Sequence, residues 1–524
     1  MTPTKIALVG LPGSGKTTIA PLLAERLGWR SLDLDAEIVA GAGRPVVSIF
    51  TQEGEASFRN RELQALETAL DDPDPMVIAC GGGVIAQEQA RRALLERSCV
   101  VWLDAPDEVL TSRLSNGAVR PLLSGDPAQA IASLRSAREE AYAHAHLRVE
   151  TAASATSVAD RVAESVRDAI RVDAPSGAYN VHVGPGRVDD IALVVPPKAC
   201  TVVLIADAAV TSLSQQLMTA LRTTRRAVAT VEVEGGEALK TWDEAGALLN
   251  RLSECNVRRQ DCILAVGGGS VGDVSGFIAA TYLRGIEWIN IPTTLLAMVD
   301  SAVGGKTGVN LRSGKNLAGA FWQPRAVLCD PTLVRQLPDR AYRAALSEIV
   351  KYAMIGAHGI VDLLEHRLPL LLDRDMDTLC DVIKLCVAFK ALTVSKDERD
   401  TGVRAILNYG HTVGHAIEAA ARFADINHGE AVAVGMRVAG RLSTRMLGCP
   451  SDDVAWQDGM LDACGFTTPQ ALDRRALLDA LQRDKKTVRD QVRWVLLKRR
   501  GEPLTGQQVV EDVLAAALDD VLRP

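Results

Sequence analysis

The segment Gly10-Leu-Pro-Gly-Ser-Gly-Lys-Thr17 constrains this chain more than any other feature, because it fits the pattern G-x-x-x-x-G-K-[ST]. It follows a short apolar run, residues 6–9, and precedes an amphipathic stretch, so it predicts a strand, a glycine-rich turn and a helix. In that arrangement backbone N–H groups face a phosphate, Lys16 supplies charge to the outer phosphates, and the Thr17 hydroxyl can bind Mg²⁺. We therefore expect a phosphate and Mg²⁺ site made by the turn and the first helical residues: Gly13, Ser14, Gly15, Lys16, Thr17 and Thr18.

Short apolar runs alternate with longer amphipathic stretches from Lys5 onward, which is typical of βαβ units on a parallel sheet. A chain of 524 residues is too long for one hydrophobic core. A second block of the same kind begins at Tyr179, and beyond Pro331 the strand patterns give way to long helical ones. We predict an α/β protein in four segments: a P-loop domain over residues 1–171, a Pro/Ser/Gly-rich linker over 172–178, a second α/β domain over 179–330 and an all-helical domain over 331–524.

The composition excludes several classes of protein. A formal net charge of −7 gives no general attraction to nucleic acid or to an anionic membrane. No segment approaches the 18 or so apolar residues of a membrane span. The ten cysteines are scattered without a metal-binding or disulfide-like spacing, so we expect reduced thiols and a cytoplasmic protein that binds small molecules.

Two carboxylates and several arginines follow the P-loop. Asp33 and Asp35 stand at the end of the expected second strand, where one can help to hold Mg²⁺ and the other a substrate hydroxyl. Other polar or glycine-rich positions follow in a fixed order: Arg59, Gly81, Gly82, Gly83, Arg120 and Arg138. Taken in this order with the P-loop, these residues resemble shikimate kinase over residues 5–170.

This resemblance implies an NMP-kinase-like parallel sheet and transfer of the γ-phosphoryl group of ATP, bound with Mg²⁺, to the 3-hydroxyl of shikimate. Asp35 would hold the substrate hydroxyls and act as a base, and Asp33 would help to position Mg²⁺. Arg59 and Arg138 would clamp the shikimate carboxylate, which suits the planar guanidinium fork. Arg120 would lie on a lid over the phosphates. The resemblance assigns catalysis to Lys16, Asp35 and Arg120, and close backbone approach to the substrate to Gly81, Gly82 and Gly83.

The second half of the chain carries a cluster of histidines. His411 and His415 are four residues apart, so they share one face of a helix, and His428 follows shortly after. Three of the chain's eight histidines thus fall within eighteen positions, which indicates a metal site. Glu348 and Lys351 stand three apart on another helical pattern. Glycine-rich turns near residues 235–237 and 267–273 are of the type that approaches a dinucleotide.

Between these features lie lysine-bearing and glycine-bearing turns at residues 304–307 and 314–316, which favour an anionic ligand. The whole series resembles 3-dehydroquinate synthase over residues 179–500. The resemblance implies a Rossmann-like NAD domain, residues 179–330, followed by a helical metal domain, residues 331–524. It also implies conversion of the keto-acid phosphate DAHP to 3-dehydroquinate and phosphate. Bound NAD⁺ would oxidise and then re-reduce one ring hydroxyl, so that it is needed but not consumed.

The resemblance assigns roles to three further groups of residues. The ligands of a divalent metal, Zn²⁺ or Co²⁺, would be Glu348, His411 and His428. The NAD⁺ contacts would be Asp207, Glu237, Lys240, Gly268, Gly269, Asp273, Thr293 and Thr294. The substrate would be held by Arg284, Asp300, Lys306, Lys315, Asn316, Lys351, Lys390, Arg404, Asn408 and one of Lys485 and Lys486. His415 would assist proton transfer, and Lys306 and Lys351 would also act in catalysis.

Some positions depart from the family pattern, and two alternative functions stay open. Ala209 and Ala341 replace an expected Asn and Glu, which concerns NAD binding and packing more than the metal and phosphate positions.

The second half could instead be a sister sugar-phosphate cyclase, although Lys390, Arg404 and Asn408 suit a carboxylated substrate. The first half could be a nucleotide-binding regulator without activity. The resemblance also implies a homodimer formed through the second half.

Overall fold

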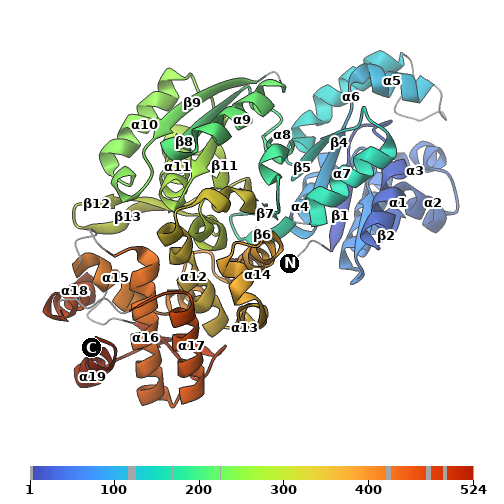
Figure 1. Ribbon diagram of the computed structural model, residues 1–524. Helices are drawn as coiled ribbons and strands as arrows, with labels where there is room; N and C mark the ends of the chain where they lie inside the picture. Colours follow the sequence, from blue (N-terminus) through green and yellow to red (C-terminus); the bar gives the residue numbers. More distant parts are fainter. Residues whose placement is uncertain are drawn as a thin grey trace.

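The computed structural model describes residues 4–115, 126–167, 169–224, 226–420, 426–467, 474–487 and 493–522. We call residues 4–167 the front unit, 169–330 the middle unit and 331–522 the helical unit. Figure 1 shows the front unit beside the sheet of the middle unit, with the helical unit packed below that sheet. The predicted α/β class and the order of the units are confirmed.

The front unit is a parallel five-stranded sheet in the order β2-β3-β1-β4-β5. These strands are β2 (Arg30–Asp33), β3 (Met76–Ala79), β1 (Lys5–Val9), β4 (Cys99–Asp104) and β5 (Leu147–Glu150). The helices are α1 (Lys16–Leu27), α2 (Leu34–Ala42), α3 (Val46–Asp71), α4 (Glu88–Arg97), α5 (Asp107–Ser115), α6 (Pro127–Tyr142) and α7 (Ala155–Arg167). Side chains alternate along β1: Ile6 and Leu8 pack with α1 and α7, whereas Ala7 and Val9 pack with α3, α4 and α6. Both faces of this sheet are therefore buried, as expected of a parallel sheet.

The middle unit is a seven-stranded sheet in the order β6-β7-β14-β11-β10-β8-β9. The strands are β6 (Ala169–Ala174), β7 (Gly177–Val183), β14 (Ala326–Cys329), β11 (Glu287–Pro292), β10 (Cys262–Gly267), β8 (Thr201–Asp207) and β9 (Ala227–Val233). All neighbouring strands are parallel except β6 and β7. The main helices are α8 (Ile191–Val194), α9 (Thr211–Arg222), α10 (Trp242–Glu254) and α11 (Gly269–Thr281), and a separate hairpin is formed by β12 (Lys306–Leu311) and β13 (Gly314–Phe321).

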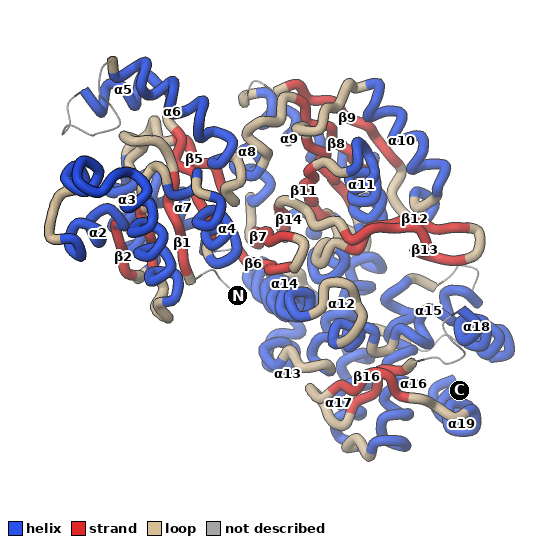
Figure 2. The backbone as a smooth tube through the Cα atoms, turned by 180° about the vertical axis from the view of Figure 1, so that it is seen from behind, coloured by secondary structure: helices blue, strands red, loops and turns tan. Residues whose placement is uncertain are grey.

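The segment expected to be a linker, residues 172–178, is not a tether. It forms the end of β6, a turn and the start of β7, so the chain enters the middle unit as an antiparallel hairpin. Pro175, Ser176 and Gly177 suit a hairpin turn as well as they suit a linker, which is why composition alone did not separate the two. Figures 1 and 2 both place this hairpin between α4 of the front unit and the helical unit.

Buried polar contacts join the front unit to the middle unit. Arg171 on β6 is 8% exposed and donates from Nη1 to Ser98 O at 2.9 Å and from Nη2 to Leu95 O. Arg325, directly before β14, donates to Ala145 O at 2.9 Å. Apolar side chains of both units also belong to one continuous core, in which α8 packs against β5. The front and middle units are therefore packed directly against each other and are not joined only by a flexible linker.

The helical unit contains α12 (Asp339–Met354), α13 (His358–Leu372), α14 (Met376–Lys396), α15 (His411–Ala420), α16 (His428–Leu447), α17 (Ser451–Ala463), α18 (Arg474–Thr487) and α19 (Glu511–Leu522). It also contains a short hairpin, β15 (Trp494–Leu497) with β16 (Pro503–Gln507), which the helical pattern did not predict. None of the described helices has the combined length and hydropathy that a membrane crossing requires.

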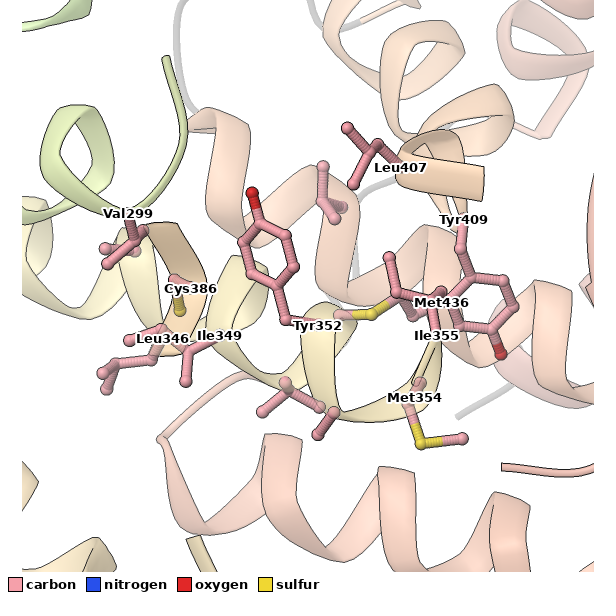
Figure 3. Close-up of a cluster of buried hydrophobic side chains, with 14 of the residues drawn as sticks. Val299, Leu346, Ile349, Tyr352, Met354, Ile355, Cys386, Leu407, Tyr409 and Met436 are labelled. Atoms are coloured by element: carbon pink, nitrogen blue, oxygen red, sulfur yellow. The ribbon is translucent and has the colours of Figure 1, made fainter. Parts of the chain in front are cut away.

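Helix α12 lies in the core of the helical unit. Twelve of its sixteen residues are buried. Figure 3 shows Leu346, Ile349 and Tyr352 of α12 among other buried side chains, including Val299 and Cys386. Dense packing fixes side-chain positions, so polar groups carried by α12 are held rigidly.

Candidate active sites

The P-loop has the predicted form. The turn between β1 and α1 places Gly13 and Gly15 at φ 84° and 95°, which glycine adopts without a Cβ penalty. Lys16 is buried, and its Nζ donates to Gly10 O at 2.9 Å and Leu11 O at 3.1 Å. A cavity of about 380 Å³ opens on the loop, and Thr17, Thr18, Asp33, Asp35 and Gly82 also line it. This volume lies within the usual range for small-ligand sites.

The two carboxylates after β2 have different environments. Asp33 caps α2 and accepts from the backbone N–H groups of Asp35 at 3.0 Å and Ala36 at 3.3 Å. This cap fixes the start of α2, so that Asp35 stands in its first turn. Both carboxylates line the P-loop cavity, as the sequence predicted.

The glycine turn after β3 lies against the predicted arginines. A Cβ built on Gly83 would fall 2.3 Å from Nη1 of Arg59, and one built on Gly82 would fall 3.3 Å from Nη1 of Arg138. Arg138 also donates to Gly82 O at 3.0 Å. On Gly81, a Cβ would lie 3.0 Å from Oδ1 of Asp35. The structure thus brings the predicted substrate residues of the front unit together around this glycine turn.

Two further residues belong to this site although sequence reasoning missed them. Glu62 on α3 is fully buried and accepts from Arg59 at 2.7 Å. Burial raises the pKa of Glu62, although Arg59 opposes the effect. Arg113 on α5 lines the P-loop cavity and donates to Gly13 O at 3.2 Å and Thr151 O at 2.8 Å. The spacing of Glu62, three residues after Arg59 on one helix, was the available signal.

The predicted dinucleotide residues meet at the carboxyl ends of the parallel strands. Asp207 ends β8, the turn with Glu237 follows β9, Gly268 follows β10 as the N-cap of α11, and Thr293 follows β11. In open α/β sheets this edge is where ligands bind. Other members of the predicted set also contact this edge: Lys240 donates to Asp273 at 2.6 Å and to Asn316 at 2.6 Å, and the Thr294 side chain lies beside Gly268. Gly269 opens α11.

The predicted metal ligands come together from three helices. Glu348 on α12, His411 at the start of α15 and His428 at the start of α16 each offer one ligand atom, and these atoms lie within 4.8 Å of one another. Oε1 of Glu348 is 3.4 Å from Nε2 of each histidine. Glu348 is fully buried, and its carboxylate pairs with the ammonium group of Lys351. The donor set of two imidazoles and one carboxylate suits Zn²⁺ or Co²⁺.

The protonation of these groups follows from burial and nearby charge. Burial lowers the pKa of His411 to about 3, which keeps this imidazole neutral. Burial would raise the pKa of Glu348, but Lys351 and His411 outweigh it and hold the pKa at about 2. Burial would lower the pKa of His428, but the carboxylates of Glu348 and Glu418 raise it to about 9. A cation that binds His428 therefore displaces a proton.

Buried cations lie next to the metal ligands. Lys351 pairs with Glu348, and Lys390 donates from Nζ to both O and Oδ1 of Asp300 at 2.7 Å. The hydroxyl of Tyr352, which the sequence analysis did not single out, donates to the same Asp300 oxygen at 2.8 Å. Burial lowers the pKa of Lys390 to about 8. Two buried lysines thus lie next to the metal ligands, each paired with a carboxylate.

Four more predicted residues border this pocket. Arg404 is 2% exposed and donates to Gly304 O at 3.1 Å, beside the turn that leads to Lys306. Lys306 pairs with Asp400, and Lys315 lies 3.5 Å from Glu418 on α15. The ring of His415 is centred 5.4 Å from that of His411. Several cationic side chains that the sequence predicted to hold the substrate thus lie in this part of the structure.

The structure does not place every predicted residue in these sites. Arg284 is exposed on the turn Tyr282–Arg284 with φ 66°, and no hydrogen bond or ion pair joins it to another predicted residue within the described ranges. Asn408 is exposed at the end of the turn Val403–Asn408, three residues before His411. Arg120 lies outside the described residues, as do the side chains of Lys485 and Lys486. Ala341, where a Glu was expected, lines a cavity of about 390 Å³ together with Thr294 and His428.

Comparison with known proteins agrees with both sites. Residues 230–344 match the family model of the 3-dehydroquinate synthase N-terminal domain, and residues 345–487 match that of its C-terminal domain. The 3-dehydroquinate synthase of Bordetella pertussis is 39% identical over 351 residues, which is 67% of this chain and 98% of that protein. The enzyme of Rippkaea orientalis is 36% identical over 359 residues, or 67% of this chain and 97% of that protein. The chain belongs to the 3-dehydroquinate synthase family.

A shikimate kinase domain precedes the synthase in the same chain, because residues 12–171 match the family model of shikimate kinase. We therefore call residues 4–167 the kinase half and residues 169–522 the synthase half. A solved structure of 2-deoxy-scyllo-inosose synthase with carbaglucose-6-phosphate, NAD⁺ and Co²⁺ is similar to the synthase half. It is 28% identical, covers 68% of this chain and 100% of that chain, and has a TM-score of 0.62. Both families consist of enzymes, and the predicted fusion of the two is confirmed.

Proposed function

We propose that both halves are catalytically active: the kinase half phosphorylates shikimate with ATP, and the synthase half converts DAHP to 3-dehydroquinate and phosphate. One observation carries this proposal. Each half brings its predicted residues together from distant parts of the chain, around the P-loop in one case and around Glu348, His411 and His428 in the other. A chain that kept the fold for binding or regulation alone would not need both groups of residues.

In the kinase half, we assign substrate binding to the residues around the glycine turn. Arg59 and Arg138 present guanidinium groups at Gly83 and Gly82, where the carboxylate of shikimate can be held by two planar forks. Asp35 lies on the P-loop side of the same turn, within reach of a hydroxyl that faces the phosphate. ATP with Mg²⁺ supplies the phosphoryl group, and Lys16, Thr17 and Asp33 would hold its phosphates and the metal. Catalysis here is mainly positioning and neutralisation of charge.

In the synthase half, Glu348, His411 and His428 fit a divalent metal, since the buried carboxylate and the two Nε2 atoms that face it lie within 4.8 Å of one another. The bound metal would supply Lewis-acid polarisation of a substrate hydroxyl. The strand-end residues from Asp207 to Thr294 would hold NAD⁺, which accepts a hydride and returns it. A similar structure supports both groups, since the related 2-deoxy-scyllo-inosose synthase was solved with NAD⁺ and Co²⁺.

The basic residues around the metal ligands would hold the two anionic groups of DAHP. Lys390 and Arg404 are buried on one side, and Lys306, Lys315 and Lys351 border the rest of the pocket. Asp300 keeps Lys390 in place through two hydrogen bonds. His415, next to His411, is placed to move a proton at the substrate. The predicted substrate contacts of Asn316 and Asn408 stay proposals, as do those of Arg284, Lys485 and Lys486.

Asp35→Asn tests the kinase assignment. We expect shikimate-dependent formation of ADP to fall by about 10²-fold to 10⁴-fold, because the amide cannot accept the hydroxyl proton. The affinity for ATP should stay within about twofold, since the P-loop is unchanged. Steady-state kinetics and ATP titration measure both values. If shikimate does not stimulate ADP formation in the unaltered chain, the kinase half is a nucleotide-binding regulator and the proposal fails.

The pH dependence of the synthase tests the role of Lys390. A lysine is charged below its pKa, and burial lowers the pKa of Lys390 to about 8. We therefore expect kcat/KM for DAHP to fall above about pH 8, by up to about tenfold per pH unit. Lys390→Arg is the matched control, because a guanidinium group keeps its charge through this range and should remove the decline. An identical decline in both proteins would assign the titration to another group.

The sister-cyclase alternative differs from the proposal in the substrate. Release of phosphate from DAHP, measured on the intact chain, distinguishes a 3-dehydroquinate synthase from a sister sugar-phosphate cyclase. The buried cations Lys390 and Arg404 favour a carboxylated substrate, and the relatives at 36% and 39% identity are 3-dehydroquinate synthases. No phosphate release above background would contradict the proposal and favour the sister cyclase.

We also propose a homodimer formed through the synthase half. Leu317 on β13 is 53% exposed and Trp242 on α10 is 58% exposed, and we place both in the surface that a second copy would cover. Light scattering of the purified chain tests this assembly.

The cytoplasm is the compartment that we propose, since all ten cysteines are free thiols.

A further inference from the structure

Glu418 on α15 lies between the metal ligands and the pocket for the substrate. Its Oε1 atom is 3.5 Å from Nδ1 of His428 and 3.5 Å from Nζ of Lys315. The residue is 6% exposed. A buried carboxylate is costly unless it is paired, so these two contacts account for its position. Neither the sequence analysis nor the proposed mechanism uses this residue.

His411 and His428 of the metal site each have one oxygen atom facing each ring nitrogen. In each, Nε2 faces Oε1 of Glu348 at 3.4 Å, while Nδ1 faces an oxygen on the opposite side of the ring. For His411 that oxygen is the carbonyl of Tyr409 at 3.3 Å, and for His428 it is the carboxylate of Glu418. An imidazole that donates its Nδ1 proton presents an unprotonated Nε2 to a metal, and such a partner also orients the ring.

Helix α15 supplies both one ligand and the partner of the other. His411, His415 and Glu418 stand at positions i, i+4 and i+7, so they share one face of the helix. His428 opens α16, where a capping box between Asn427 and Glu430 fixes the first turn. Because α15 and α16 pack against each other, Glu418 reaches the His428 ring across that contact.

We propose that Glu418 is a positioning residue of the synthase, which fixes the tautomer and ring orientation of His428 and holds Lys315 of the β12–β13 hairpin beside the metal site. This inference rests on the proposed metal site. It assigns to Glu418 no direct contact with the metal or with a reacting atom. The second contact matters because Lys315 belongs to a separate hairpin, so one carboxylate ties the hairpin of the middle unit to the helices that carry the ligands.

Metal affinity tests the proposal without relying on turnover. The dissociation constant for Co²⁺ can be measured on the full chain by competition with a chelator, with the visible spectrum of bound Co²⁺ as the readout. For Glu418→Ala we expect about 10-fold to 100-fold weaker binding, the usual effect of losing the partner of a metal-bound histidine. Glu418→Gln keeps the volume and an acceptor oxygen but loses the charge. Its affinity for Co²⁺ should therefore lie between those of the unaltered chain and Glu418→Ala, at least about threefold below the unaltered chain.

Two further variants separate the contacts. Lys315→Met removes the pair with Glu418 and the 3.8 Å pair with Glu237 but leaves the contact between Glu418 and His428, so the metal affinity should stay within about threefold while KM for DAHP rises. Glu365→Gln removes a carboxylate of the helical unit that contacts Trp456 and Arg500, and it should change neither quantity. Circular dichroism and thermal unfolding of the metal-free proteins show whether each variant is folded.

The outcomes are distinct. If the unaltered chain takes up no stoichiometric metal, the proposed metal site itself fails, and the role of Glu418 fails with it. If the unaltered chain binds metal and Glu418→Ala binds within threefold of it, only the positioning role is overturned. If Glu418→Ala does not fold, Glu418→Gln decides: affinity equal to that of the unaltered chain overturns the proposal, and weaker affinity supports it.

Discussion

Glu348→Gln is expected to abolish metal uptake and synthase activity while leaving the kinase half active. Glu348 is the one anionic ligand of the three, and it is fully buried. A glutamine keeps the volume but removes the charge that attracts the cation, and it leaves buried Lys351 without its partner. If the metal supplies about 4 kcal/mol of transition-state stabilisation, phosphate release from DAHP falls by about 10³-fold. Elemental analysis of the purified protein and both activity assays measure the result.

Lys16→Met is the reciprocal control. Its Nζ atom donates to Gly10 O and Leu11 O of the P-loop, so the variant should lose shikimate-dependent ADP formation by about 10³-fold and keep its metal and its synthase activity. Opposite losses in the two variants establish two separate catalytic sites on one chain. If Glu348→Gln retained one metal per chain, the proposed ligand set would be wrong.

Arg171→Ala is expected to destabilise the kinase and synthase halves together. The guanidinium group crosses from β6 to the carbonyls of Ser98 and Leu95, and it is buried. Alanine would leave two buried carbonyl oxygens of the kinase half without a donor. Hydrogen bonds to charged groups contribute about 1.5–3 kcal/mol each, so we expect the free energy of unfolding to fall by about 3 kcal/mol. Urea unfolding followed by fluorescence and by both activities measures the change.

Lys198→Ala is the matched control for this contact. Lys198 also crosses between the halves, but it is half-exposed and lies 3.7 Å from the exposed Glu140. Exposed ion pairs contribute little, so the free energy of unfolding should change by less than about 0.5 kcal/mol. Equal stability of Arg171→Ala and the unaltered chain would mean that the halves are independent despite their contact.

Some active-site residues could be predicted from the sequence, and others could not. The P-loop is a contiguous pattern, and the shared helix face of His411 and His415 follows from a spacing of four. The roles of Glu348 and Arg138 came from resemblance to families, since nothing in their local sequence distinguishes them from surface residues. Glu62 and Glu418 escaped prediction because a lone carboxylate on a helix is ordinarily solvated. Their partners become apparent only when the helices pack.

The sequence by itself determined the two enzyme families, the P-loop, the histidine helix and the order of the units, because these depend on residues that are close along the chain. Tertiary structure alone decided two further features. It placed Glu418 beside Nδ1 of His428, and it made residues 169–183 a hairpin whose Arg171 is buried against the kinase half. The reason is physical: Pro, Ser and Gly permit a turn or a tether equally, and only a partner strand and a buried acceptor select between them.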